Sequence, residues 1–135
     1  MEDTLALIKP DAIRMEVWLE IIDSYRNAGL EIVKTKLMPF MEKGIAERFY
    51  QEHKGKDFFE KNISFITSGP VIALHLRGDK AIQKVRDING TTDPKKALPG
   101  TIRQKYGKGG PENAVHGSNS NESAKRELLI IFCDE

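Results

Sequence analysis

Thr4-Leu5-Ala6-Leu7-Ile8, followed at once by Lys9-Pro10-Asp11, is the stretch that decides the fold. A short apolar run that ends at a proline predicts a buried strand at the start of the chain. The run Val71–Leu76, introduced by Gly69-Pro70, predicts a second buried strand of the same character. The β-branched residues between Leu30 and Met38 predict another strand, which precedes it in the chain.

Segments with helical periodicity separate these strands. Between Glu16 and Ala28, apolar residues recur with the period of a helix, and Gly29 supplies a stop. Two short helical stretches, Glu42–Glu52 and Asp57–Ile66, are expected before the strand at Val71. After that strand, Asp79 is expected to cap a helix with one apolar face.

The last third of the chain begins with a loop from Asn89 to Ser118 that is rich in Gly and Pro. Ser120 or Asn119 is then expected to cap a short helix that runs into a last strand, Leu128–Phe132. This order of elements predicts an α+β fold of the ferredoxin-like (split βαβ) kind in a single domain, 1–135. We expect a four-stranded antiparallel sheet, helices on one of its faces and a long functional loop.

Composition narrows the class of protein. The chain has 135 residues and a formal net charge of +1, which argues against dedicated nucleic-acid binding. Cys133 is the single cysteine, so no disulfide forms within the chain, and a reducing compartment is expected. Glu2 and Asp3 stand where a signal peptide would carry positive charge, and no segment reaches membrane-spanning length. We expect a cytoplasmic protein with no membrane partner.

His116 is the most informative residue for function. It lies in Asn113-Ala114-Val115-His116-Gly117-Ser118-Asn119-Ser120, where small neighbours leave room for a tetrahedral group beside the ring. Neutral imidazole is a competent nucleophile near neutral pH. Phosphate-binding cations and donors lie near element ends elsewhere in the chain: Lys9, Arg86, Thr92 and Arg103. The pattern indicates an enzyme that carries a phosphoryl group on histidine.

Taken singly, most of these residues also have an ordinary structural interpretation. A surface Lys or Arg is usually solvated, and Glu127 at the start of the expected last strand would be a strand-edge charge. His53 is expected to face solvent, His75 to belong to the sheet, and Phe58 to lie in the core. There is no P-loop or Gly-x-Gly-x-x-Gly signature, and the histidines and the cysteine lack the spacing of metal ligands.

A set of motifs in a fixed order resembles the nucleoside diphosphate kinase family over essentially the whole chain. The motifs are Lys9-Pro10-Asp11, Tyr50 with Phe58-Phe59, Ser68-Gly69-Pro70, Thr92-x-Pro94, Pro99-Gly100-Thr101-Ile102-Arg103 and Asn113-x-x-His116-Gly117-Ser118. The resemblance implies a ping-pong kinase in which His116 takes the γ-phosphate of a triphosphate, usually ATP, and passes it to a nucleoside diphosphate.

The resemblance also implies roles for single residues. Glu127 and Ser118 would orient the imidazole of His116, and Phe58 would stack on the base. The phosphates and the sugar would be bound by Lys9, Tyr50, Arg86, Thr92, Arg103 and Asn113. Mg²⁺ would be held mainly by substrate phosphates and water, near Asn119. Members of the family are typically hexamers, less often tetramers or dimers, so a homo-oligomer is expected.

Two departures from the family pattern bear on the site, and a third, the missing Arg-Gly pair near Met15-Glu16, is expected to affect helix entry instead. Asn119 stands where an aspartate is usual, which is expected to weaken Mg²⁺ binding. Gly110 stands where an apolar residue often covers the base, which is expected to loosen the base clamp. Two other functions stay open on the residues alone: a histidine phosphocarrier that only relays a group, and a nucleotide-binding or nucleic-acid-binding module without activity. The preferred base, the sugar and any regulatory role are not encoded in a recognisable pattern.

Overall fold

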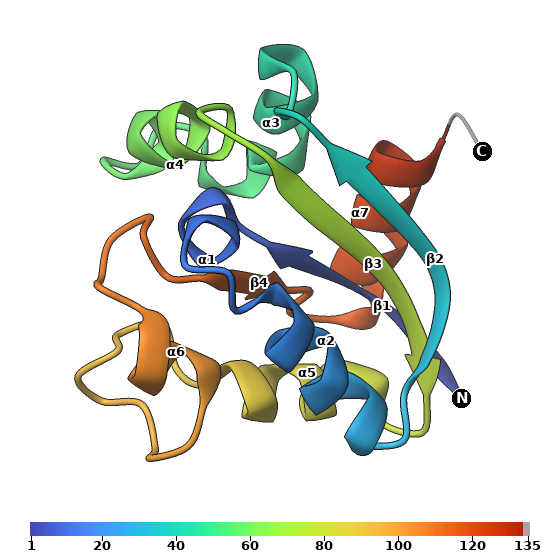
Figure 1. Ribbon diagram of the computed structural model, residues 1–135. Helices are drawn as coiled ribbons and strands as arrows, with labels where there is room; N and C mark the ends of the chain where they lie inside the picture. The colour runs from blue at the N-terminus through green and yellow to red at the C-terminus, as the bar shows by residue number, and fades with distance from the viewer. Residues whose placement is uncertain (134–135) are drawn as a thin grey trace.

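The computed structural model of the chain describes residues 1–133 and contains one four-stranded sheet with helices packed around it (Figure 1). The strands are β1 (Glu2–Ile8), β2 (Glu31–Met38), β3 (Val71–Gly78) and β4 (Val115–Gly117). They lie in the order β2-β3-β1-β4, and every neighbouring pair is antiparallel. β1 and β2 therefore run in the same direction on either side of β3, as the split βαβ arrangement requires. The predicted fold class is confirmed.

The helices connect the strands. They are α1 (Pro10–Arg14), α2 (Trp18–Asn27), α3 (Lys43–Phe49), the 3₁₀ turn η1 (Gln51–His53), α4 (Phe59–Ile66), α5 (Ala81–Asn89), α6 (Ile102–Tyr106) and α7 (Asn121–Phe132). Among residues 1–133, no helix combines the length and the apolarity that crossing a bilayer requires.

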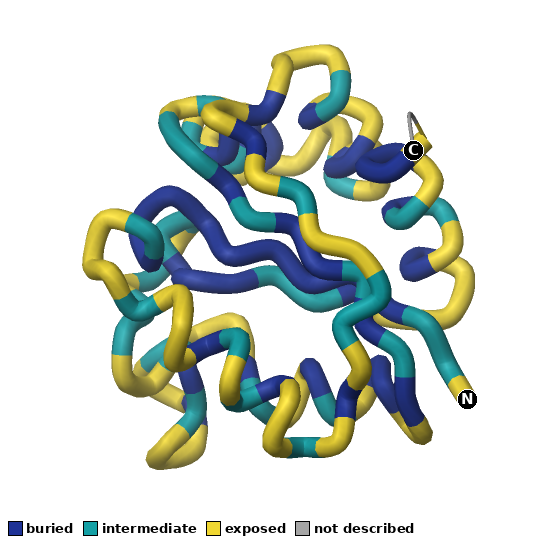
Figure 2. Tube along the Cα trace, turned by 45° about the vertical axis from the view of Figure 1, so that its right-hand side comes forward, coloured by how far each residue is buried: buried dark blue, intermediate teal, exposed yellow. Residues whose placement is uncertain are grey.

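Helices cover both faces of the sheet, so the prediction of helices on one face alone is wrong. Leu5 and Leu7 of β1 pack with residues of α3, α4 and α7 on one face. Ala6 and Ile8 pack with α2 and α5 on the other. Side chains along a strand point alternately to its two faces, so a strand buried on both faces needs an uninterrupted apolar run. The dark central strands of Figure 2 show this double burial.

The end of the chain differs from the sequence prediction. Leu128–Phe132 was expected to form a strand, but it is the last part of helix α7. Five of the six buried positions of α7 (Ser123, Ala124, Glu127, Ile130 and Ile131, but not Phe132) follow the helical period, which the apolar run at its end obscured. The fourth strand is instead β4, a three-residue element inside the stretch expected to be a loop. That stretch also contains α6.

Local signals explain where several helices begin. Pro10 occupies the first position of α1, a short helix that the sequence analysis did not identify. Ser120 accepts a hydrogen bond from the Ser123 amide at the start of α7, as expected. The expected cap by Asp79 is wrong, because Lys80 is the residue before α5 and has no side-chain cap. The amide of Ile82 donates instead to a carboxylate oxygen of Glu2 at 3.2 Å.

Two glycines with open surroundings give a test of the backbone. Gly29 ends α2 at φ +89°, whereas Gly44 lies within α3, and an added Cβ meets nothing within 4 Å at either position. Gly29→Ala should destabilise the fold by about 1 kcal/mol because a Cβ strains the left-handed conformation. Gly44→Ala should stabilise it by about 0.4–1 kcal/mol. Urea unfolding of both variants checks this, and equal effects of the same sign would contradict it.

Candidate active site

A cleft of about 1080 Å³ opens between the segment that carries α3, η1 and α4 and the segment that carries α5 and α6. The sequence-predicted residues that line it are Lys9, Tyr50, Phe58, Arg86, Thr92, Arg103, Asn113, His116 and Asn119. The remaining two predicted residues, Ser118 and Glu127, contact one another beside His116. The structure thus gathers into one place residues that are spread over the chain.

His116 owes its orientation to the pairing of β4 with β1. It lies directly opposite Leu7 in the register, and residues opposite one another in an antiparallel pair point to the same face. Leu7 points to the face covered by α3 and α7. The ring of His116 therefore meets Phe49 of α3, with ring centroids 4.9 Å apart. It meets Glu127 of α7 on the same face.

The bond between His116 and Glu127 distinguishes the two ring nitrogens. His116 Nε2 lies 2.9 Å from Glu127 Oε1, and Ser118 Oγ donates to the same oxygen at 2.7 Å. A carboxylate partner places the imidazole proton on Nε2, which leaves a lone pair on Nδ1. Within residues 1–133, Nδ1 has no hydrogen-bond partner and is not among the buried unpaired atoms. Nδ1 is thus unpaired within the described residues, on a side chain that lines the cleft.

Glu127 is ionised although it is buried, with 5% of its side chain exposed. Burial alone would raise the pKa of this carboxyl group. His116, the hydroxyl of Ser118 and the guanidinium of Arg126 outweigh burial and hold the pKa below its ordinary value. Because Glu127 belongs to α7 rather than to a strand, its expected position at the start of a strand is wrong, while its predicted proximity to His116 is correct.

The Lys9-Pro10-Asp11 motif holds the backbone just before His116. Ala114 has φ +71°, a left-handed conformation that is uncommon for a residue with a Cβ. Asp11 Oδ2 accepts a hydrogen bond from the Ala114 amide at 2.9 Å, and the Lys9 amide donates to the Ala114 carbonyl at 2.9 Å. Two hydrogen bonds therefore stabilise a strained residue at the entrance to β4.

Lys9 contributes a cation to the cleft. Its ammonium lies 3.4 Å from the carbonyl of Pro111. Burial, and after it the positive charge of Arg103, lower the pKa of Lys9, Asp11 partly opposes both effects, and the resulting pKa is about 8. Among residues 1–133, no carboxylate lies within ion-pair distance of Lys9, so this cation is suited to an anion that arrives from solution.

Arg103 is the second fixed cation. Its two terminal nitrogens donate to the carbonyls of Gly90 and Val115, both at 2.8 Å. These bonds join α6 to the residue after α5 and to the residue before His116. Burial lowers the pKa of Arg103, but the guanidinium stays charged at any physiological pH. Gly90 is required here, because a Cβ would lie 2.6 Å from Thr101 Oγ1.

Unsatisfied polar atoms gather at the cleft. Among residues 1–133, five buried side-chain atoms lack a hydrogen-bond partner, and four belong to residues of the cleft wall or of the adjoining motif. These four are Asp11 Oδ1, His53 Nδ1, Arg103 Nε and Asn113 Oδ1. Since buried polar groups are nearly always paired, this concentration indicates a polar ligand.

Aromatic side chains from the segment that carries α3, η1 and α4 form one wall of the cleft. Phe58 is 43% exposed at the cleft, whereas its neighbour Phe59 is buried, so the expectation that Phe58 lies in the core is wrong. His53 does not simply face solvent, as was expected, because its ring lies 5.1 Å from that of Phe58. Tyr50 is buried, and burial together with the negative charge of Glu127 raises the pKa of its hydroxyl group. His75 belongs to the sheet, as expected.

Some residues of the cleft were missed by sequence reasoning. Asn89 is buried on the apolar face of α5 and accepts a hydrogen bond from the Tyr25 hydroxyl at 2.6 Å. The sequence offered one signal for Asn89: it is an amide at the same helical spacing as the apolar residues Ala81 and Val85. Asp87 and Asp93 line the cleft as well, without a sequence pattern that sets them apart.

The cleft offers few oxygen ligands for a resident metal. Among the described residues, no group of three or more His, Cys, Asp or Glu side chains could hold a metal ion. Asn119 lies at the cleft and is exposed, so it can reach a hydrated cation rather than enclose a bare one.

Comparison with known proteins gives one consistent result. The family model "Nucleoside diphosphate kinase" matches residues 2–135. A nucleoside diphosphate kinase of Sulfurisphaera tokodaii is 47% identical over 135 residues, which cover 100% of this chain and 91% of the relative. One of Bdellovibrio bacteriovorus is 46% identical over 132 residues, covering 98% of this chain and 93% of that protein.

Solved structures agree. The Aquifex aeolicus nucleoside diphosphate kinase superposes with a TM-score of 0.93 at 37% identity, covering 97% of this chain and 94% of that one. The Halobacterium salinarum nucleoside diphosphate kinase, solved in complex with CDP, gives a TM-score of 0.92 at 37% identity, covering 97% and 87%. With the motifs gathered around one cleft, these similarities lead to a single conclusion: the chain belongs to the nucleoside diphosphate kinase family.

Proposed function

We propose that this chain transfers the γ-phosphate of a nucleoside triphosphate, usually ATP, to a nucleoside diphosphate by a ping-pong reaction through phosphohistidine on His116. The observation that carries the proposal is the free Nδ1 of His116, which faces a cleft that also holds Lys9 and Arg103. The membership of the family supports it as well.

In the first half-reaction, the lone pair of His116 Nδ1 forms a bond to the γ-phosphorus. The bond from that phosphorus to the bridging oxygen breaks, and the nucleoside diphosphate leaves with the electron pair. The proton stays on Nε2, where Glu127 stabilises the positive charge that the phosphorylated ring acquires. In the second half-reaction, a terminal oxygen of an acceptor diphosphate attacks the same phosphorus, and the electron pair returns to Nδ1.

The cations act mainly through charge and position. The transition state of phosphoryl transfer spreads negative charge over the equatorial oxygens, so fixed positive groups lower its energy. Lys9 and Arg103 would bind the phosphates nearest His116, with Tyr50, Arg86, Thr92 and Asn113 on the remaining phosphates and the sugar. The side-chain amide of Asn113 donates to the Thr92 carbonyl at 3.1 Å, which fixes the loop between them.

Mg²⁺ would enter with the phosphates and neutralise part of their charge. The exposed side chain of Asn119 fits contact through water with a cation that the substrate carries. Asn119 lacks the negative charge of an aspartate, so we expect weaker attraction of Mg²⁺ there.

We further propose that residues 1–135 form one domain that assembles into a homo-oligomer, a hexamer rather than a tetramer or dimer, in the cytoplasm. Exposed apolar side chains on α2 and after β2, among them Leu19 and Phe40, support an assembly. Sedimentation of the purified protein distinguishes these states, and a monomer would contradict the proposal.

Replacing His116 tests the covalent step. His116→Ala should lower turnover by about 10⁴-fold or more, as loss of a covalent nucleophile does. The parent protein, given γ-labelled ATP and Mg²⁺, should hold an acid-labile label on His116 that moves to an added diphosphate of a different base. His75→Ala, which removes a histidine of the sheet, should label like the parent. Labelling of His116→Ala at the parent level, or label that never reaches a diphosphate, would contradict the proposal.

The lowered pKa of Lys9 leads us to expect that nucleotide affinity depends on pH. In the free protein the pKa of Lys9 is about 8, below the ordinary value of 10.5, and a bound polyphosphate raises it. Binding therefore takes up a proton when the pH exceeds about 8, and affinity falls above that pH by at most about tenfold per pH unit. Titration of a diphosphate by calorimetry between about pH 7 and pH 10 measures this. In Lys9→Arg, which stays charged, the decline should disappear; an unchanged slope there would contradict it.

The exposed position of Phe58 at the cleft leads to a prediction about how the base is bound. Phe58→Ala should weaken binding of purine and pyrimidine diphosphates alike by roughly 1–3 kcal/mol, because every base offers a face to an aromatic ring. Phe58→Leu keeps an apolar side chain without the ring and should lie between parent and Phe58→Ala. Dissociation constants of ADP and CDP for the three proteins check this. A protein that only relays phosphoryl groups would show no change.

A further inference from the structure

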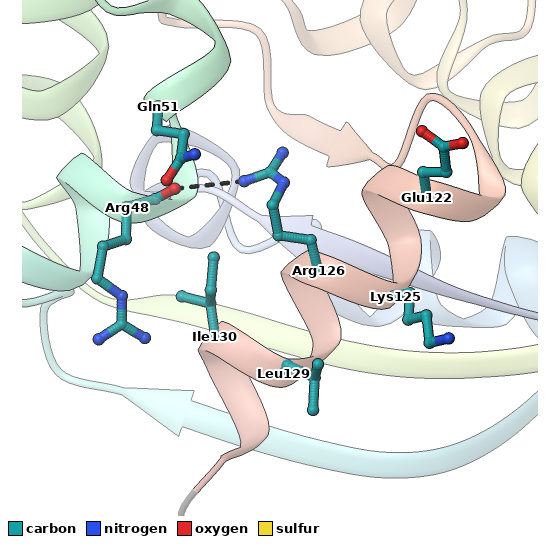
Figure 3. A pocket seen from close by; sticks show the side chains of 7 residues that line it. All are labelled: Arg48, Gln51, Glu122, Lys125, Arg126, Leu129 and Ile130. Atoms are coloured by element: carbon teal, nitrogen blue, oxygen red, sulfur yellow. Dashed lines mark hydrogen bonds between the residues drawn. The ribbon is translucent and has the colours of Figure 1, made fainter.

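A second groove lies on the outer side of the molecule, between α3 and α7, with a volume of about 640 Å³ (Figure 3). Arg48 and Gln51 line it on one side, and Arg126 and Leu129 of α7 line it on the other. Arg126 differs from the other lining residues because it is next in the chain to Glu127, the partner of His116. One side chain of the groove wall, Arg126, thus lies close to the carboxylate that contacts His116.

The guanidinium of Arg126 is held at several points. One terminal nitrogen donates to the carbonyl of Arg48 at 3.3 Å (Figure 3). It also donates to the carbonyl of Phe49 at 3.4 Å, where α3 ends. The other donates to Glu52 of η1 at 2.7 Å. The last carbonyls of a helix lack intrahelical partners and carry partial negative charge, so they suit a cation. Arg126 thereby ties α7 to the segment that carries Phe49 and Tyr50.

The same guanidinium faces the second oxygen of Glu127. Arg126 Nη2 lies 3.7 Å from Glu127 Oε2, while Oε1 is occupied by His116 and Ser118. Among residues 1–133, His116 and Arg126 are the two basic side chains within ion-pair distance of this carboxylate. A carboxylate with 5% exposure needs such compensation to remain ionised.

We propose that Arg126 is a positioning residue for the reaction, which holds the Glu127 carboxylate charged and directed at His116 Nε2 while it fixes α7 against the end of α3. The inference rests on the proposed phosphohistidine function. Arg126 does not line the nucleotide cleft, so it acts through Glu127 and through the placement of Phe49 against the His116 ring.

The groups that face Glu127 set the sign of the effect. They are His116 and Ser118 next to Oε1, Arg126 next to Oε2, and Tyr50 at the end of α3. Arg126 contributes to the lowered pKa of Glu127. Removal of this positive charge should raise the pKa of the carboxyl group, so that protonation on lowering the pH removes activity at a higher pH than in the parent.

Single-turnover labelling with γ-labelled ATP measures the effect. In Arg126→Gln, phosphohistidine should form about tenfold more slowly, a loss typical of groups that orient a functional histidine from behind. The affinity for nucleotide should be unchanged, and the acid limb of the rate should move to higher pH. Arg126→Lys should recover most of the rate and show a smaller shift in the same direction. Arg48→Gln removes a charge that points away from Arg126 in the same groove, and it should behave like the parent.

The nitrogen resonances of His116, followed by ¹⁵N NMR, provide a readout that does not depend on turnover. In Arg126→Gln they should move away from the Nε2-protonated form of the parent. If the parent fails to label, the proposed function fails, and this NMR comparison still tests Arg126. If Arg126→Gln does not fold, the pH at which Arg126→Lys loses its rate on the acid side tests the proposal instead. An acid limb and ¹⁵N shifts like those of the parent in every folded Arg126 variant would overturn the proposal, as would a loss confined to nucleotide affinity.

Discussion

The hydrogen bond between His116 and Glu127 is the interaction on which the site depends, because it decides which ring nitrogen faces the cleft. Three separate features must agree for it to form. The register of β4 against β1 turns His116 toward the face of Leu7, α7 packs on that face, and the helical period brings Glu127 inward. A shift of β4 by one residue would turn His116 to the other face and leave Glu127 buried without its partner.

The structure around this bond stores unfavourable energy at the cleft. Lys9 is a buried cation with a lowered pKa, Ala114 holds a left-handed conformation, and several polar atoms lack partners. Each feature costs stability. The two buried clusters on either side of the sheet supply the stability that tolerates these costs. The cleft therefore carries features that cost stability, and a sheet covered on both faces compensates for them.

Local patterns predicted the fold well where one signal dominated. The apolar runs of β1 and β3 and the stop at Gly29 were correct in type and place. The prediction for the end of the chain was wrong because five consecutive apolar residues hide the helical period of α7. The strand β4 was missed because it is short and lies in a Gly-rich stretch. Resemblance to a family identified the candidate site residues. No local pattern predicts that Glu127 reaches His116 from a helix, because tertiary packing makes that contact.

The positions that depart from the family pattern lie where they affect the mouth of the cleft rather than the reacting atoms. Gly110 has φ +60°, and an added Cβ would meet nothing within 4 Å, so the cleft is open at this position. Under the proposed function, the base contact would fall mainly to Phe58, an exposed aromatic side chain at the cleft that can stack on any ring. Stacking on a single aromatic ring would discriminate little between purines and pyrimidines, because every base offers a face to it. Under the proposed function, recognition would then rest mainly on the phosphates and the sugar, which the cations and polar side chains of the cleft are placed to bind.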